Sequence, residues 1–214
     1  MNEQLILDKT KEFVENQLKK DASGHDFFHI ERVVKLAKYI QKNEGGNLFL
    51  IELSALLHDI GDYKLNKGVD LQEKLITEFL ESLQLDKANI SEVLQIVTSI
   101  SYSKSYENRE LSLEAKILQD ADRLDAIGAL GIARTFAYGG SNGSIMYDPE
   151  IKPKNITNTE EYKNAKSTTI NHFYEKLLLL SAKMNTETAK ILAKKRHQFM
   201  LDYLNEFYKE WNFV

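Results

Sequence analysis

Two histidines and two aspartates are the residues of this chain best suited to metal chemistry: His29, the adjacent pair His58-Asp59, and Asp122. Each lies in a stretch whose pattern predicts a helix. Two imidazoles and two carboxylates form a complete ligand set for one divalent cation of borderline or hard character. A single histidine is more often a surface or hydrogen-bonded core residue than a ligand, so the hypothesis depends on the whole set.

Helices are also predicted to position these side chains. Helical periodicity or capping residues mark 3–20, 27–43, 48–60, 70–84, a helix that starts after Asp86, 111–138 with a bend near Gly128 and Gly131, 159–183, and a last helix from Asn185 or Thr186 to about residue 210. Asp26 is expected to cap the second helix, and Asp70 with Glu73 resembles a capping box. No convincing strand run is present, so the expected fold is all-α.

The composition restricts the class of protein. With 214 residues and 43% hydrophobic content, the chain can bury the core of one domain, 1–214. Because there is no cysteine, disulfides and thiolate metal sites are excluded. The net charge is -4 without a basic stripe, which argues against duplex nucleic acid as a partner. No signal peptide and no apolar run of ~20 residues is found, so a cytoplasmic protein that does not bind membranes is expected.

Three motifs then match a known family. Gly24–Val33, Leu57–Gly61 and Asp120–Asp125 resemble, in order and separation, the motifs of the HD superfamily of metal-dependent phosphohydrolases over about residues 20–130. The resemblance implies an HD-domain helical bundle with a metal-site core over about 20–130 and additional C-terminal helices over about 131–214. It places the metal ligands on His29, His58, Asp59 and Asp122. Asp122 precedes Arg-Leu as the family motif requires, and Asp120 is the alternative.

The C-terminal part of the chain resembles one subgroup of this family. Residues 171–177 and 184–188 look like a bacterial subgroup of small HD hydrolases associated with hydrolysis of nucleoside triphosphates to monophosphate and pyrophosphate. The His58-Asp59 pair is followed by Ile60-Gly61-Asp62, and no Gly-Tyr-Pro signature comes after it. Both features argue against the cyclic-dinucleotide phosphodiesterase branch of the family. Since the extra histidines that would build a second metal site are not close by in sequence, one metal ion is expected. Manganese is favoured, with magnesium, iron, nickel or cobalt as alternatives.

Such an ion would lower the pKa of a bound water, and the resulting hydroxide would attack phosphorus. Asp62 is the first candidate for a general acid or base, because the helical pattern puts it one turn after His58 and three residues after Asp59. His25, four residues before His29, is the second candidate. The alternatives are a turn carboxylate and a solvent-exposed histidine without catalytic roles.

Phosphate oxygens need cationic donors. Arg32, three residues after His29, is the favoured one, and a salt bridge to a neighbouring carboxylate is its alternative role. Weaker candidates for substrate binding are Lys64, Lys104, Lys152, Lys154, His172 and Lys176. The run Lys194-Lys195-Arg196 is interpreted as a solvated face. Residues 139–158 form one long irregular stretch, either a functional lid that carries Lys152 and Lys154 or a flexible loop.

The leading hypothesis is therefore an enzyme, a metal-dependent hydrolase of phosphate bonds whose substrate is a small nucleotide. One alternative keeps the chemistry but takes another small phosphorylated metabolite, as a phosphatase or phosphodiesterase. Another is a non-catalytic nucleotide-binding helical module. The helices from about residue 159 either complete the active site or form a homodimer interface.

Overall fold

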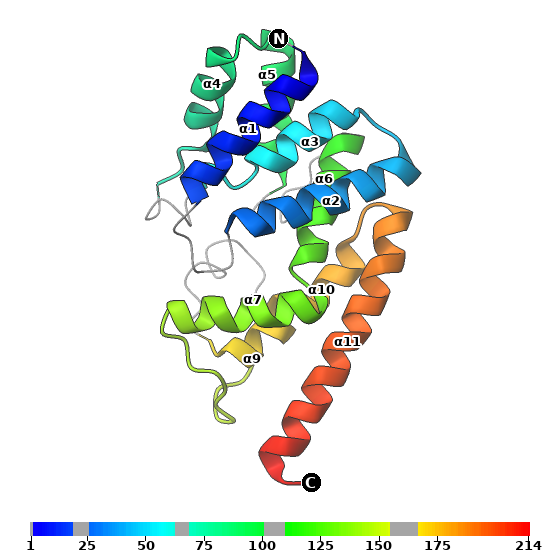
Figure 1. Cartoon of the computed structure of the whole chain (residues 1–214). Helices are drawn as coiled ribbons and strands as arrows, with labels where there is room; N and C mark the ends of the chain where they lie inside the picture. The colour runs from blue at the N-terminus through cyan, green and yellow to red at the C-terminus, as the bar shows by residue number, and fades with distance from the viewer. Residues whose placement is uncertain (1, 19–25, 63–68, 101–109, 155–166) are drawn as a thin grey trace. The chain divides into compact units, whose positions relative to one another are not determined.

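The computed structural model describes residues 2–18, 26–62, 69–100, 110–154 and 167–214 (Figure 1). In these ranges the regular structure is entirely helical and contains no strand, which confirms the all-α prediction. The contacts divide the described residues into two units, one reaching to Ala121 and the other from Asp122 to Val214. No helix in the described ranges is long and apolar enough to span a bilayer.

The first unit is built around a central apolar helix, α3. Its elements are α1 (Glu3–Leu18), α2 (Phe27–Glu44), α3 (Leu48–Leu57), α4 (Gln72–Ser82), α5 (Lys87–Ser99) and most of α6 (Leu113–Asp125). Helix α3 packs against α1, α2 and α5, and eight of its ten residues are buried. A helix that is apolar on nearly all sides must lie inside a bundle, and this places its C-terminal end, where His58 follows, in the interior of the unit.

Side-chain caps fix where the helices of the first unit begin. The Asp26 carboxylate accepts a hydrogen bond from the His29 backbone N–H at 2.9 Å, which confirms the predicted cap of α2. Asp86 caps α5 in the same way through Asn89. The predicted capping box of Asp70 with Glu73 is wrong. Leu71 occupies the cap position of α4, and Asp70 instead accepts from the Gln72 N–H at 3.1 Å, two residues on.

The second unit contains the end of α6 and the helices that follow it. These are α7 (Gly128–Ser141), α9 (Thr169–His172), the π-helical turn η2 (Phe173–Leu177), α10 (Leu178–Leu180), the 3-10 turn η3 (Ser181–Lys183) and α11 (Glu187–Asn212). Phe173 is fully buried against the rings of Phe136 and Tyr203. Of the two predicted caps of α11, Asn185 and Thr186, it is Thr186 that caps the helix, through the Ala189 N–H.

Two predicted helices of this region differ from the observed ones. The expected single helix over 111–138 is two helices, because α6 ends at Asp125 and Gly128 takes a left-handed φ of +80° at the start of α7. The expected helix over 159–183 falls partly outside the described residues. From Thr169 it is helical but includes η2, in which the hydrogen bonding widens by one residue.

The predicted irregular stretch 139–158 begins too early, because residues 139–141 belong to α7, and its remaining described part, 142–154, is tied to the helices that follow it. The backbone N–H groups of Thr169 and Ile170 donate to carbonyls of this loop at 2.9 and 3.0 Å. The Asn171 amide donates to the Ile151 carbonyl at 2.8 Å, and the Glu175 carboxylate accepts from the Lys154 N–H at 2.9 Å. These bonds show an anchored loop in residues 142–154, and its role as a lid stays a prediction.

Candidate metal centre

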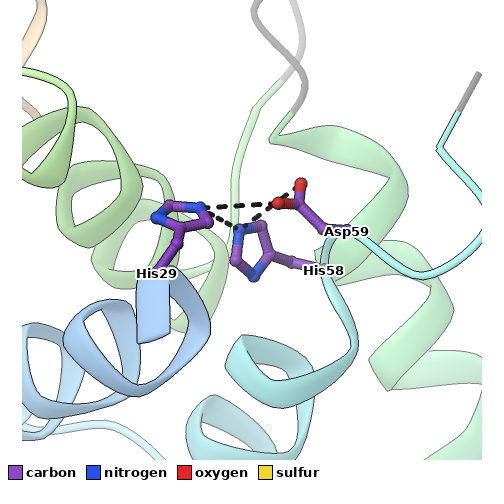
Figure 2. A group of neighbouring side chains, drawn as sticks. All are labelled: His29, His58 and Asp59. Atoms are coloured by element: carbon purple, nitrogen blue, oxygen red, sulfur yellow. Dashed lines mark hydrogen bonds and ion pairs between the residues drawn. The ribbon is translucent and has the colours of Figure 1, made fainter. Parts of the chain in front are cut away.

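Three of the four predicted ligands converge in the first unit. His29, His58 and Asp59 point their side chains toward one another from α2 and from the turn after α3 (Figure 2). The two Nε2 atoms lie 3.3 Å apart. The His29 Nε2 lies 3.5 Å from one carboxylate oxygen of Asp59, and the His58 Nε2 lies 3.6 Å from the other. Residues 29 apart in sequence thus present a compact set of nitrogen and oxygen donors.

His29 is held by the start of α2. It is the third residue of the helix, its backbone N–H is bound by the Asp26 cap, and its side chain has no exposed surface. A capped first turn has little freedom to fray, so the backbone that carries the imidazole is held in place.

His58 and Asp59 lie in a tight turn rather than in a helix, which corrects the prediction that helix continues to residue 60. Helix α3 ends at Leu57. The Ile60 and Asp62 N–H groups then donate to carbonyls three residues back, and Gly61 takes a left-handed φ of +75°. A glycine is required because a Cβ at this position would lie 2.7 Å from the backbone of Leu71 and Gln72.

The other face of the turn is held by the start of α4. The Gln72 side-chain amide donates to the His58 carbonyl at 2.6 Å, and the Leu71 N–H donates to the Gly61 carbonyl at 2.9 Å. Nothing in the sequence indicates that Gln72 holds this turn, because a glutamine in the first turn of a helix is ordinary. Its role depends on a contact that only the folded unit makes.

The tautomer of His58 follows from its second ring nitrogen. Its Nδ1 lies 2.8 Å from the Ala55 carbonyl, which only accepts hydrogen bonds, so Nδ1 carries a proton. In the neutral imidazole the lone pair is then on Nε2, which lies 3.3 Å from the His29 Nε2 in the cluster. Histidine ligands to metals are typically oriented by such a bond from the other ring nitrogen to a backbone carbonyl.

The donor set fits a divalent cation. Ligand bonds of about 2.1 Å put neighbouring donor atoms roughly 3.0 Å apart in an octahedron and roughly 3.4 Å apart in a tetrahedron, and the observed separations are 3.3 to 3.6 Å. Burying two imidazoles beside a carboxylate costs free energy unless the groups are paired or ligated. A cation shared by all three groups satisfies this requirement.

The acidic residues near the end of α6 have different surroundings. Asp122 is half-buried and is the first residue of the second unit. Asp125 is fully buried and pairs with the Arg134 guanidinium at 2.8 Å, so its carboxylate already has a cationic partner. Asp120 is also buried. The preference for Asp122 over Asp120 as the fourth ligand stays a prediction.

The remaining candidates are distributed over both units. Asp62 follows Gly61 in the turn, so the helical spacing from His58 that suggested its orientation does not apply. Arg32 is half-buried in the second turn of α2. The predicted roles of both residues stay predictions. His25, Lys64 and Lys104 lie outside the described residues.

In the second unit, Lys152 and Lys154 are exposed, and the Lys152 ammonium donates to the Pro149 carbonyl at 2.7 Å. His172 ends α9 and Lys176 lies in η2, both half-buried. The interpretation of Lys194-Lys195-Arg196 as a solvated face is wrong for Arg196. This residue is half-buried, and its guanidinium donates to the Leu124 carbonyl.

Comparison with known proteins identifies the family of the chain. A family model described as the HD domain matches residues 27–127. YpgQ of Bacillus subtilis is 37% identical over 98% of this chain and 96% of its own length. The chain belongs to the HD-domain family.

Solved structures of similar proteins match along nearly the whole chain. The structure of a Lactobacillus plantarum protein is 39% identical, covers 100% of both chains and superposes with a TM-score of 0.89. An HD-superfamily hydrolase from Bacillus thuringiensis is 44% identical, covers 99% of both chains and has a TM-score of 0.76. YpgQ has been solved in complex with ADP, at 36% identity and a TM-score of 0.76 over 95% of this chain and 97% of YpgQ. The likeness therefore extends through the C-terminal helices that follow the HD match.

Proposed function

We propose that this protein is a metal-dependent phosphohydrolase that cleaves nucleoside triphosphates to the monophosphate and pyrophosphate. The observation that carries the proposal is the convergence of His29, His58 and Asp59 in an HD-family chain. The ADP complex of YpgQ supports a nucleotide as the substrate class, and the nucleoside triphosphate is the specific form that we infer.

His29 and His58 supply neutral Nε2 donors, and Asp59 and Asp122 supply carboxylate oxygens. Two negative charges against the two charges of a divalent cation leave the site neutral, so it does not repel a phosphate that approaches it. A cation bound there polarises phosphoryl oxygens and lowers the pKa of water near it. Manganese is the ion that we propose first, because it accepts mixed imidazole and carboxylate ligands.

Other residues of the first unit handle the proton and the phosphates. Asp62 lies three residues after Asp59 in the same turn and is proposed to take up or release a proton. Arg32 lies three residues after His29 on α2, and its planar guanidinium suits two phosphate oxygens at once. Asp62 and Arg32 each lie three residues from a proposed ligand, so each is carried by the same short stretch of backbone as that ligand.

The test is product analysis on metal-stripped protein with single metal ions added back. A panel of nucleoside tri-, di- and monophosphates is incubated with manganese, magnesium, nickel or cobalt, and pyrophosphate and orthophosphate are measured separately. We expect metal-dependent pyrophosphate from triphosphates. Orthophosphate as the product, or activity on monophosphates alone, would still indicate a hydrolase. It would rule out cleavage of triphosphates to the monophosphate and pyrophosphate.

The site assignment is tested by Asp59→Asn, which keeps the side-chain shape and removes the charge. We expect turnover to fall at least about 100-fold and manganese affinity to fall about 10-fold or more. Asp202→Asn is the matched control, because Asp202 is exposed on α11 and accepts a hydrogen bond from Gln198 in the same helix. Unchanged manganese affinity and turnover in Asp59→Asn would disprove the proposed centre.

A further inference from the structure

Two arginines hold the C-terminal end of α6, the helix that carries Asp122. The Arg123 guanidinium donates to the carbonyl of Lys183, the last residue of η3. The Arg196 guanidinium, from α11, donates to the carbonyl of Leu124. Both contacts lie within the second unit, and they connect α6 to helices that follow it by 60 and 72 residues.

Arg196 is placed by its whole side chain. Its stem passes over Gly128, where a Cβ would lie 3.0 Å from its Cγ and 3.1 Å from its Cβ, so a glycine is needed there to admit the arginine. Burial lowers the pKa of the Arg196 guanidinium from its ordinary value, and the nearby Asp125 carboxylate opposes that shift. Arg134 neutralises Asp125 from α7 at 2.8 Å. A surface arginine in a charge run would have none of these features.

The bond to Leu124 stabilises the last turn of α6. The final carbonyls of a helix lack partners within the helix and carry its partial negative charge. Here the Leu124 carbonyl accepts from the Ile127 N–H at 3.3 Å and also from Arg196, while the Asp122 carbonyl accepts from the Ala126 N–H at 3.2 Å. Asp122 therefore lies in the turn that Arg196 closes, two residues before the carbonyl that the guanidinium binds.

We propose that Arg196 is a positioning residue for the metal ligand Asp122: by closing the last turn of α6 from α11, it holds that carboxylate in the orientation that metal binding requires. The inference rests on the proposed function, because it assumes that Asp122 is a ligand. It gives the helices after the HD match a direct part in metal affinity. Partners that orient a ligand typically contribute 10- to 100-fold in metal affinity.

The experiment measures manganese affinity of the full chain without nucleotide, by calorimetry. Arg196→Met keeps the stem over Gly128 and removes the donor, and we expect about 10-fold weaker binding. Arg196→Lys keeps the aliphatic stem and the charge but lacks the planar guanidinium group, and we expect a manganese affinity between those of Arg196→Met and wild type. Lys195→Met is the matched control, because Lys195 is exposed on the same helix, and its affinity is expected to equal wild type.

Two further measurements separate positioning from simple destabilisation. Thermal unfolding of the metal-free variants gives a temperature at which each is fully folded, and manganese affinity is measured at that temperature. The absorption spectrum of bound cobalt then reports the ligand geometry, and we expect it to change in Arg196→Met and not in Lys195→Met. Wild-type affinity and spectrum in Arg196→Met, or in Arg196→Lys if the methionine variant does not fold, would overturn the inference.

Asp122→Asn and Asp120→Asn distinguish this failure from failure of the proposed function. We expect a large loss of manganese affinity in Asp122→Asn only. If Asp122→Asn binds manganese as wild type does, the ligand assignment is wrong and the inference falls with it. If Asp122→Asn loses affinity while the folded Arg196 variants retain it, the metal centre stands and only the positioning role is refuted.

Discussion

Gly61 offers the sharpest test of how the turn at His58 and Asp59 is built. In Gly61→Ala the new Cβ would lie 2.7 Å from three backbone atoms of Leu71 and Gln72, at a φ of +75°. Backbone cannot swing aside as the end of a long side chain can. The substitution must therefore open the contact between the turn and the start of α4.

The expected cost has separable parts. A left-handed conformation costs a residue with a Cβ roughly 1–2 kcal/mol. Opening the contact also weakens the 2.9 Å bond from the Leu71 N–H to the Gly61 carbonyl and the 2.6 Å bond from Gln72 to the His58 carbonyl, each about 1 kcal/mol. We expect the free energy of unfolding of Gly61→Ala to be about 3–4 kcal/mol below wild type.

Two other glycines provide controls for these parts. Gly143 has a φ of +67° with no atom within 4 Å of a Cβ, so Gly143→Ala should cost only the conformational part, roughly 1–2 kcal/mol. Gly140 lies in helix α7 with equally open space, and Gly140→Ala should stabilise by up to about 1 kcal/mol.

The assay is denaturant unfolding of the metal-free chain followed by circular dichroism, with manganese affinity measured on each folded variant. Manganese affinity should fall in Gly61→Ala and be retained in Gly140→Ala and Gly143→Ala. The crowding explanation is refuted if Gly61→Ala costs no more than Gly143→Ala. It is also refuted if Gly61→Ala loses stability but binds manganese like wild type.

Two further predictions concern the second unit. Glu175 is buried and accepts from the Lys154 N–H and the Ser167 hydroxyl at 2.9 and 2.7 Å, so Glu175→Ala should lower the free energy of unfolding by about 2–4 kcal/mol and Glu175→Gln by less. Denaturant titration checks the order, and equal stability of the alanine variant and wild type would contradict it. Burial, followed by a hydrogen bond with Tyr174, raises the pKa of Tyr208 above the value near 10 of an unfolded tyrosine. The folded state therefore retains this proton more tightly, so the stability linked to it is full below about pH 10 and is lost as the pH rises further. Tyr208→Phe should lose less stability than wild type between pH 8 and pH 10.5, and parallel losses would count against the shift.

Much of this protein was determined by local sequence. The Asp26 cap of α2 and the Thr186 cap of α11 were predictable because a cap joins residues three apart, whose geometry depends little on the rest of the fold. The position of α3 inside the first unit followed from its apolar composition. The motifs around His29 and His58 indicated the family because their residue types, order and separation are read directly from the chain.

What tertiary structure decided depends on contacts between distant residues. Helix α3 stops at Leu57, before the His-Asp pair, and backbone some ten residues later packs against Gly61 and requires glycine there. Arg196 lies in a run of charges that indicated a solvated face, yet its partner carbonyl is 72 residues away. Sequence periodicity reports which side of a helix is apolar. It does not report which distant backbone group a buried guanidinium or glycine meets, because that is fixed only when the helices pack.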